Sequence, residues 1–179
     1  MEDMMITWAR CNPKAKIPTK REEDAGADIY GIFEDDIILM KVGDIKVFKT
    51  GLKFACGGNW YPQIAERGST GFIGLSYRAG VFDSGFRNEW KIILNNTSNK
   101  EIILYNDEEY SKQESLALLH PHSNNLRNLE LYSFYPMSKG IAQVVFNYVP
   151  KYNWVEIEEE DLQYFQSERG EGMLGSTQK

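Results

Sequence analysis

The sequence predicts an all-β protein, an antiparallel sandwich or barrel-like fold, and three observations support this prediction. Apolar runs are short and rich in Ile, Val, Phe and Tyr, the residues that favour strands. Gly, Asp and Asn separate several of these runs, as they do at turns between strands. A convincing helical repeat of more than about 12 residues is absent from the sequence. Together these features favour many short strands connected by turns.

Each apolar run predicts one strand. The predicted strands cover residues 36–40, 45–48, 51–55, 60–65, 90–94, 101–105 and 141–149. Turns are expected at 43–44, 57–59 and 95–96, where turn-forming residues cluster. The acidic stretch 156–161 is compatible with the start of a short helix or with a solvated segment, and we expect the solvated segment.

The chain has 179 residues, enough for one compact domain and too few for two ordinary domains with a linker. We expect this domain to span residues 1–165. Residues 106–136 form a polar stretch between two predicted strands, longer than ordinary connections, and we interpret it as an insertion. Residues 166–179 are rich in Gly and Ser and lack apolar periodicity, which predicts a mobile C-terminal arm. Mobile arms can serve as lids.

The composition limits the possible functions. A formal net charge of −6 argues against a protein that coats nucleic acid, because such binding needs a basic surface. A triphosphate can still be held by a few local Arg side chains and a metal. Cys11 and Cys56 are far apart, so we expect reduced thiols rather than a disulfide or zinc site. Apolar runs fall short of the roughly 20 residues that span a bilayer, and the N-terminus is acidic, so a cytoplasmic protein is expected.

Three segments carry candidate chemistry. Asp83 stands in the Gly-flanked segment 79–90, where a hairpin could present its carboxylate into a pocket, although Asp is also common in plain turns. Segment 66–71 offers an Arg, two hydroxyls and two glycines whose amides could hold a phosphate. Segment 169–177 has residues of the same kind. Its glycines satisfy a dinucleotide-binding pattern, but that pattern must open a helix, and only four residues follow Gly175.

Five segments resemble the five ordered motifs of the dUTPase family: 25–29 (AGADI), 67–71 (RGSTG), 80–87 (GVFDSGFR), 140–143 (GIAQ) and 169–177 (RGEGMLGST). The second motif is similar to that of phage-borne members. The resemblance implies a distorted antiparallel β-barrel, the jelly-roll-like β-clip fold, with a flexible C-terminal arm. It also implies a homotrimer that hydrolyses dUTP to dUMP and diphosphate with Mg²⁺, which keeps uracil out of DNA and supplies dUMP.

The resemblance also assigns roles to residues. Asp83 is expected to be the base for the water that attacks the α-phosphorus, a role suited to a carboxylate that is ionised at neutral pH. Asp28 is expected to support Mg²⁺ through its water shell. Donors that stabilise charge on the departing diphosphate are expected from Arg67, Ser69, Gln143, Arg169, Ser176 and Thr177. Further substrate contacts are expected from Gly68, Thr70, Gly80, Val81, Phe86, Leu174 and Gly175.

Within the third motif, the resemblance implies that the hairpin backbone reads uracil and that Phe86 packs under the deoxyribose. The sequence departs from the family pattern at several positions. Phe86 stands where Tyr is common, residues 139–140 are Lys-Gly where Asp-Arg is common, and Leu174 stands where an aromatic ring is common. Leu174 cannot stack on uracil. In the second motif, where Gly68 replaces a common Ser, we expect Ser69 rather than the next hydroxyl to contact phosphate.

Two alternative functions remain open. A dCTP deaminase shares the fold and a similar hairpin, but it needs a Glu ten residues after the Asp, where this chain has the apolar Ile93. A protein-binding regulator would use the insertion 106–136 to bind a partner, although a surface elaboration or a trimer contact explains the insertion as well. His120 and His122 lack further ligands at a metal-binding spacing, and we expect both to be surface residues.

Overall fold

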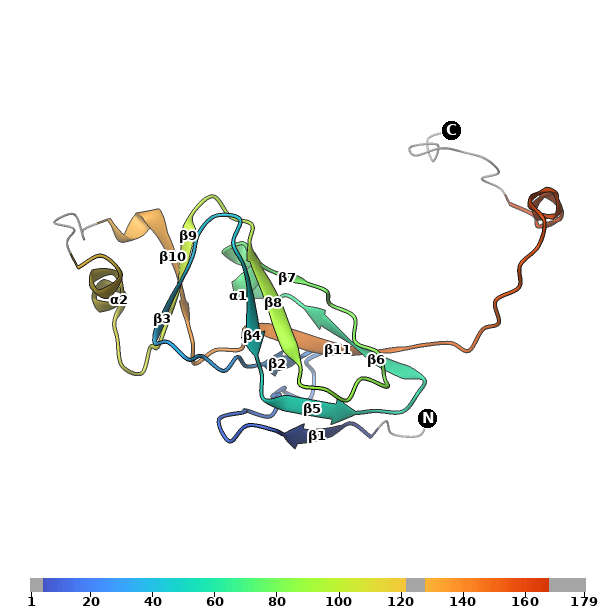
Figure 1. The fold of residues 1–179 in the computed structure, drawn as a ribbon, viewed down its shortest axis with the longest axis horizontal. Helices are drawn as coiled ribbons and strands as arrows, with labels where there is room; N and C mark the ends of the chain where they lie inside the picture. Colours follow the sequence, from blue (N-terminus) through green and yellow to red (C-terminus); the bar gives the residue numbers. More distant parts are fainter. Residues whose placement is uncertain (1–4, 122–127, 168–179) are drawn as a thin grey trace. The chain divides into compact units, whose positions relative to one another are not determined.

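The computed structural model describes residues 5–121 and 128–167 (Figure 1). The chain divides into two units, Met1–Val149 and Pro150–Lys179. This division falls earlier in the chain than the boundary expected after residue 165. The described elements of the first unit are β1 (Thr7–Arg10), β2 (Ala27–Ile29), β3 (Ile37–Met40), β4 (Ile45–Lys49), β5 (Leu52–Ala55), β6 (Trp60–Ala65), α1 (Gly68–Phe72), β7 (Leu75–Arg78), β8 (Lys91–Asn96), β9 (Glu101–Tyr105), α2 (Lys112–Leu119), the 3-10 helix η1 (Leu129–Leu131), β10 (Tyr132–Pro136) and β11 (Ala142–Tyr148).

The predicted all-β class is confirmed: the described strands form four small sheets, with the orders β1-β5, β10-β9-β3, β2-β11-β6 and β4-β8-β7 (Figure 1). These described sheets do not close into a barrel. All seven strands predicted from apolar runs are present: β6 and β9 match the predicted ranges, and the other five have ends shifted by one or two residues. Strands β1, β2, β7 and β10 escaped prediction because each is short or lies in a segment with few aliphatic residues.

Strands β9 and β10 pair in parallel, with Tyr135 opposite Leu104. These two strands differ from the antiparallel pairing expected of the fold as a whole. Parallel neighbours need a crossover of about a dozen residues or more, and the connection that carries α2 and η1 supplies it. Residues 132–136, which lie within the expected insertion 106–136, therefore form a strand of this sheet.

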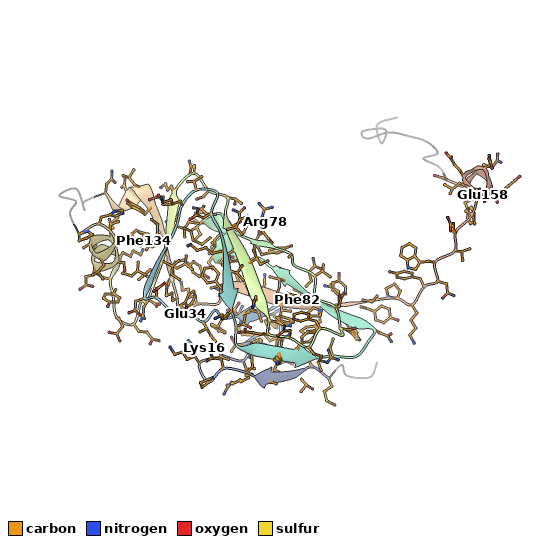
Figure 2. The ribbon with its side chains drawn as sticks, viewed as in Figure 1. Lys16, Glu34, Arg78, Phe82, Phe134 and Glu158 are labelled. Atoms are coloured by element: carbon orange, nitrogen blue, oxygen red, sulfur yellow. The ribbon has the colours of Figure 1, made fainter. Side chains whose placement is uncertain are left out.

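Strand β9 is buried on both faces. Ile102 and Leu104 belong to the main core cluster, whereas Ile103 and Tyr105 join a second cluster with Leu116 of α2. Phe134 of β10, labelled in Figure 2, packs against this second cluster. A strand covered on both faces has no alternation of apolar and polar residues, which explains why 102–105 is a continuous apolar run.

The turn expected at Asn95-Asn96 is wrong. Both residues end strand β8, and their side chains are buried. Asn96 Nδ2 donates to the carbonyls of Met40 and Lys100 at 3.0 and 2.8 Å, and Asn95 Nδ2 donates to the carbonyls of the neighbouring 43–44 turn. The carbonyls of Met40, Gly43, Asp44 and Lys100 thus accept hydrogen bonds from buried side-chain amides. Asn95 and Asn96 therefore hold the neighbouring chain segments to the end of β8.

The described part of the second unit holds the 3-10 helix η2 (Glu159–Tyr164). Every described residue between 150 and 167 is exposed, including the aromatic rings of Tyr152, Trp154 and Phe165. The solvated state expected for 156–161 is confirmed, since every residue of this stretch is exposed. Residues 159–161 also form the first half of η2. In the described part of the whole chain, helices lack the length and apolar character needed to cross a membrane.

Candidate functional site

The first, second and fourth sequence motifs meet in one cavity of about 640 Å³, a volume typical of small-ligand sites. The loop before β2 completes its wall. The lining residues are Thr19, Lys20, Arg21, Asp24, Ala25, Gly26, Asp28, Arg67, Gly68, Ser69 and Gln143. The structure therefore brings together three sequence motifs that are far apart in the chain.

Strand pairing brings the three motifs together. β11 lies between β2 and β6, with Gln143 opposite both Asp28 and Ala65. The chain leaves β6 at Ala65 and reaches Arg67 two residues later, so the second motif begins beside the same end of β11. Antiparallel register thus places Asp28, Gln143 and Arg67 near one end of the three-stranded sheet.

Arg67 is the centre of the polar contacts in this cavity. Its Nε donates to Asp28 Oδ1 at 2.6 Å, and its Nη1 donates to the Tyr135 hydroxyl at 2.8 Å and the Gly140 carbonyl at 3.1 Å. Nη1 also lies 3.3 Å from Ser69 Oγ. Burial alone would lower the pKa of Arg67, but the hydrogen bonds to Asp28 and Tyr135 outweigh it, and the pKa is raised. The guanidinium is therefore a fixed positive charge.

The two hydroxyls of the second motif have different environments. Thr70 is fully buried, and its Oγ1 accepts from Arg67 N and donates to the Arg67 carbonyl, both at 3.0 Å. This hydroxyl is committed to the turn that starts α1. Ser69 is exposed and lines the cavity. The geometry supports the expectation that Ser69 contacts phosphate. The amide groups of Gly68 and Ser69 lie in the first helical turn, where an α-helix offers no carbonyl partner.

Gln143 is held by the backbone of the second motif. Its Nε2 donates to the Glu66 carbonyl at 2.5 Å. A Cβ atom at Gly26 would lie 2.5 Å from Gln143 Oε1 and 3.0 Å from its Cδ. Glycine in the first motif therefore leaves the space that the amide of Gln143 occupies.

The third motif forms a turn packed against the opposite edge of β6. Ile64 N donates to the Gly80 carbonyl at 2.6 Å, and Phe82 N donates to the Pro62 carbonyl at 3.0 Å. Val81 thereby forms a bridge to Gln63. A Cβ atom at Gly80 would meet the Tyr77 ring and the Ile64 carbonyl, so glycine allows this close approach.

Asp83 occupies the exposed tip of this turn, whose backbone closes through a hydrogen bond of 3.0 Å from Phe86 N to the Asp83 carbonyl. Phe82, labelled in Figure 2, stacks on the fully buried Trp90 with ring centroids 4.5 Å apart. Phe86 packs edge-on against Phe82 at 5.6 Å and is half-buried. Aromatic packing on both sides of Asp83 therefore fixes the position of the turn.

Asp83 is not among the residues that line the cavity. β6 pairs with β11 along one edge and with the third-motif segment along the other. The cavity lies beside β11, so β6 separates Asp83 from the cavity within one chain. The fifth-motif residues Arg169, Leu174, Gly175, Ser176 and Thr177 lie outside the described residues, as does His122.

The residues of the cavity fit a metal held through water and substrate rather than a closed protein cage. Asp24 and Asp28 are the acidic residues that line it, and groups of three or more potential ligands are absent from the described residues. Both carboxylate oxygens of Asp24 accept from Arg21, whereas only Oδ1 of Asp28 accepts from Arg67. Mg²⁺ commonly binds through one or two carboxylates, several waters and substrate phosphates, which matches this donor set.

The sequence did not indicate two contributors to the cavity. Tyr135 lies in the segment interpreted as an insertion, and no pattern shows that its hydroxyl reaches Arg67 from a parallel strand. The loop 19–24 precedes the first motif, and its Lys20 and Arg21 add positive charge to the cavity rim. The two adjacent basic residues before the first motif, Lys20 and Arg21, are a sequence signal that could have suggested that this loop lines the cavity.

Comparisons with known proteins agree with this site. A family model described as dUTPase matches residues 12–109, more than half of the chain. The deoxyuridine 5'-triphosphate nucleotidohydrolase of Nautilia profundicola is 29% identical over 180 residues, covering 98% of this chain and 100% of that protein. The Pol polyprotein of equine infectious anemia virus (strain Wyoming) is 28% identical over 124 residues, 69% of this chain. The chain spans only 10% of the length of that polyprotein.

Solved structures share the fold. The dUTPase of Staphylococcus bacteriophage 80alpha with dUPNHPP has a TM-score of 0.66 at 20% identity, covering 97% of this chain and 98% of that one. The dUTPase of equine infectious anemia virus has a TM-score of 0.58 at 19% identity, covering 87% and 98%. These similarities confirm the predicted β fold and the predicted resemblance to phage-borne members of the family. With the family model and the convergence of three motifs, they lead to one conclusion: this chain belongs to the dUTPase family.

Proposed function

We propose that this protein hydrolyses dUTP to dUMP and diphosphate in a Mg²⁺-dependent reaction in the cytoplasm. The observation that carries the proposal is the cavity around Arg67, where three family motifs place a fixed cation, an exposed hydroxyl and a carboxylate. Its volume of about 640 Å³ suits a triphosphate. Family membership and the activity named for the Nautilia profundicola relative support the same reaction.

In the proposed mechanism, Arg67 and Ser69 bind the phosphate chain together with the first-turn amides of α1. Arg67 offers Nη2, because its four described contacts use Nε and Nη1. Gln143 supplies an amide beside them, and Asp28 would orient metal-bound water through Oδ2. Mg²⁺, when bound, supplies positive charge that offsets the charge of the departing diphosphate. These donors are in place before the reaction, so they need little reorganisation in the transition state.

Asp83 is the proposed base. Its carboxylate takes a proton from water as the water oxygen attacks the α-phosphorus, and the bond from that phosphorus to the bridging oxygen breaks to release diphosphate. Because β6 separates Asp83 from the cavity of its own chain, a neighbouring copy must supply it. The proposed homotrimer meets this requirement, since each closed cyclic assembly gives every cavity one neighbouring third motif.

Nucleoside selection is assigned to the third motif. The backbone at Gly80 and Val81 would read uracil, and the half-buried Phe86 would present its remaining free face to the deoxyribose. The fifth motif would close over the bound nucleotide, with Arg169, Ser176 and Thr177 as phosphate donors and with Leu174 and Gly175 beside the base. Thr70 is proposed to support the second motif rather than to bind phosphate, because its hydroxyl already binds the backbone N–H and carbonyl of Arg67.

The test is the release of diphosphate from dUTP, dTTP, dCTP and UTP, with and without Mg²⁺. We expect release from dUTP only in the presence of Mg²⁺, and much slower release from the other three nucleotides. An ammonia assay on dCTP tests the deaminase alternative, which Ile93 opposes because it lies in strand β8 without an ionisable group. Ammonia release from dCTP, or no diphosphate from dUTP, would contradict the proposal.

A second candidate function is the binding of a regulatory protein through the crossover between β9 and β10. Leu118 of α2 and Leu131 of η1 are 56% and 61% exposed there, so both side chains could contact a partner. Phage 80alpha dUTPases of similar fold are described as controlling transfer of virulence genes. Charge variants Leu118→Glu and Leu131→Glu should abolish partner binding while dUTP turnover persists. If a partner still binds both variants with unchanged affinity, this role of the crossover is wrong.

A further inference from the structure

We propose that Tyr135 is a positioning residue for phosphate recognition, because its hydroxyl fixes the Arg67 guanidinium so that Nη2 remains available to a phosphate oxygen. This inference deepens the proposed function and rests on it. Tyr135 would not touch the reacting atoms. Its effect would pass through Arg67, the cation at the centre of the cavity.

The hydrogen bonds of Tyr135 define the direction of each contact. Its hydroxyl donates its single proton to the Gly140 carbonyl at 2.5 Å. It must therefore accept at its oxygen from Arg67 Nη1, which lies 2.8 Å away. Ser69 Oγ lies 3.4 Å from the same hydroxyl. One phenol thus links the second motif to the carbonyl that begins the fourth motif.

Tyr135 is suited to this task because its ring cannot move freely. The residue is only 2% exposed and belongs to the main core cluster. Its backbone is fixed in the parallel pairing of β10 with β9, opposite Leu104. A tyrosine ring has few rotatable bonds, so burial of the ring places the hydroxyl at a defined point. The parallel crossover therefore has a consequence for the cavity, because it delivers β10 to this position.

The need for such a residue follows from Gly140. Where the resembled family commonly has Asp-Arg, this chain has Lys139 and Gly140. A Cβ atom at Gly140 would lie 3.0 Å from Asp28 Cβ and 3.2 Å from the Ile29 carbonyl, so this packing leaves little room for a side chain. Position 140 has no side chain to reach Arg67, so its carbonyl accepts from Arg67, and Tyr135 supplies the hydroxyl that binds both groups.

Arg67 needs two restraints to present Nη2 in one direction. The bond from Nε to Asp28 Oδ1 fixes one end of the planar guanidinium, and the Nη1 contacts with Tyr135 and Gly140 fix its rotation. Without the hydroxyl, Arg67 keeps its charge and its Asp28 partner but loses part of its orientation. Substrate binding should therefore weaken more than the chemical step, since Asp83 and the attacking water are unchanged.

The test compares Tyr135→Phe with Tyr132→Phe in the full-length protein. Tyr132 lies on the same strand, and its hydroxyl approaches His120 Nε2 at 3.3 Å rather than the cavity. We expect Tyr135→Phe to raise KM for dUTP about 3- to 10-fold, the factor expected for one hydrogen bond, with kcat within about 2-fold. The second measurement uses dUpNHpp, the ligand of the bacteriophage 80alpha dUTPase structure (dUPNHPP above). Its dissociation constant in the presence of Mg²⁺, measured by calorimetry, should rise by the same factor. Tyr132→Phe should leave both quantities unchanged.

A double-mutant cycle identifies the route of the effect. Arg67→Lys keeps the charge but cannot form the planar fork, so Tyr135→Phe should cause no further loss of dUpNHpp affinity in that background. Additive losses would overturn the proposal, because they would show that Tyr135 acts independently of Arg67. If Tyr135→Phe unfolds, 3-fluorotyrosine at position 135, whose oxygen is a weaker acceptor, provides the same comparison.

The two proposals fail differently. Absence of diphosphate release from dUTP by the wild-type protein refutes the proposed function. Release by the wild type with equal dUpNHpp affinity in Tyr135→Phe refutes the positioning role alone. A fall in kcat with unchanged KM also refutes it, since that result would place the effect of the hydroxyl on the chemical step.

Discussion

Burial of the Arg67–Asp28 pair predicts that Asp28→Asn destabilises the protein even without nucleotide. The two charged atoms lie 2.6 Å apart, and their side chains are 23% and 29% exposed. Removing one partner of a fully buried pair costs about 3–5 kcal/mol, and partial exposure reduces that cost. We therefore expect a loss of about 1–3 kcal/mol in the free energy of unfolding. For a domain of this size, the expected fall in Tm is about 3–10 °C.

A matched control exists in the same cavity wall. Arg21 and Asp24 lie 2.8 Å apart, but their side chains are 88% and 31% exposed. Asp24→Asn removes the same type of charge from a pair whose Arg side chain is solvated, so its Tm should fall less than that of Asp28→Asn. Calorimetric unfolding of both variants at one protein concentration gives the comparison, because Tm of an oligomer depends on concentration. Equal effects of the two variants would refute the reasoning, since burial would then not decide the strength of the pair.

Three further predictions concern the proposed reaction and the fold. Asp83→Asn should lower dUTP turnover by orders of magnitude and leave dUpNHpp affinity nearly intact; retained turnover would exclude Asp83 as the base. Removal of residues 166–179 should abolish most activity without changing Tm of the first unit, and a fully active truncated protein would contradict the lid role. Burial alone would raise the pKa of Asp107, but hydrogen bonds from Ser138 outweigh it and lower the pKa below 3.8. The difference in the free energy of unfolding between wild type and Asp107→Asn should therefore persist above pH 3.8 and vanish as pH falls through the folded-state pKa of Asp107. A difference that grew at low pH would show that folding raises this pKa instead of lowering it, and would contradict the prediction.

The sequence predicted those parts of the fold that depend on local pattern. Strands β6 and β9 match the predicted ranges because both are rich in strand-forming residues and turn-forming residues lie next to them in the sequence. Asn95 and Asn96 misled the prediction because Asn favours turns in general, whereas here buried amides bind loop carbonyls. Local propensity cannot indicate that a side chain meets a carbonyl more than fifty residues away.

The candidate site shows the same limit. Arg67, Asp28 and Gln143 could be assigned because they stand in ordered motifs, and strand register then placed them side by side. Tyr135 could not be assigned, because its role depends on the parallel pairing of β10, which no periodicity reveals. The separation of Asp83 from the cavity also depends on which edge of β6 each partner takes, a property of topology rather than of sequence pattern.

The central proposal is that each active site combines the Arg67 cavity of one copy with Asp83 of another. The most direct measurement mixes two inactive variants, Arg67→Ala and Asp83→Asn, after unfolding and refolding them together in equal amounts. Random assembly gives an Asp83→Asn cavity an Arg67→Ala neighbour in about one quarter of sites, so about one quarter of wild-type diphosphate release should return. A mixture that stays as inactive as its two components, although the copies exchange, would contradict the account.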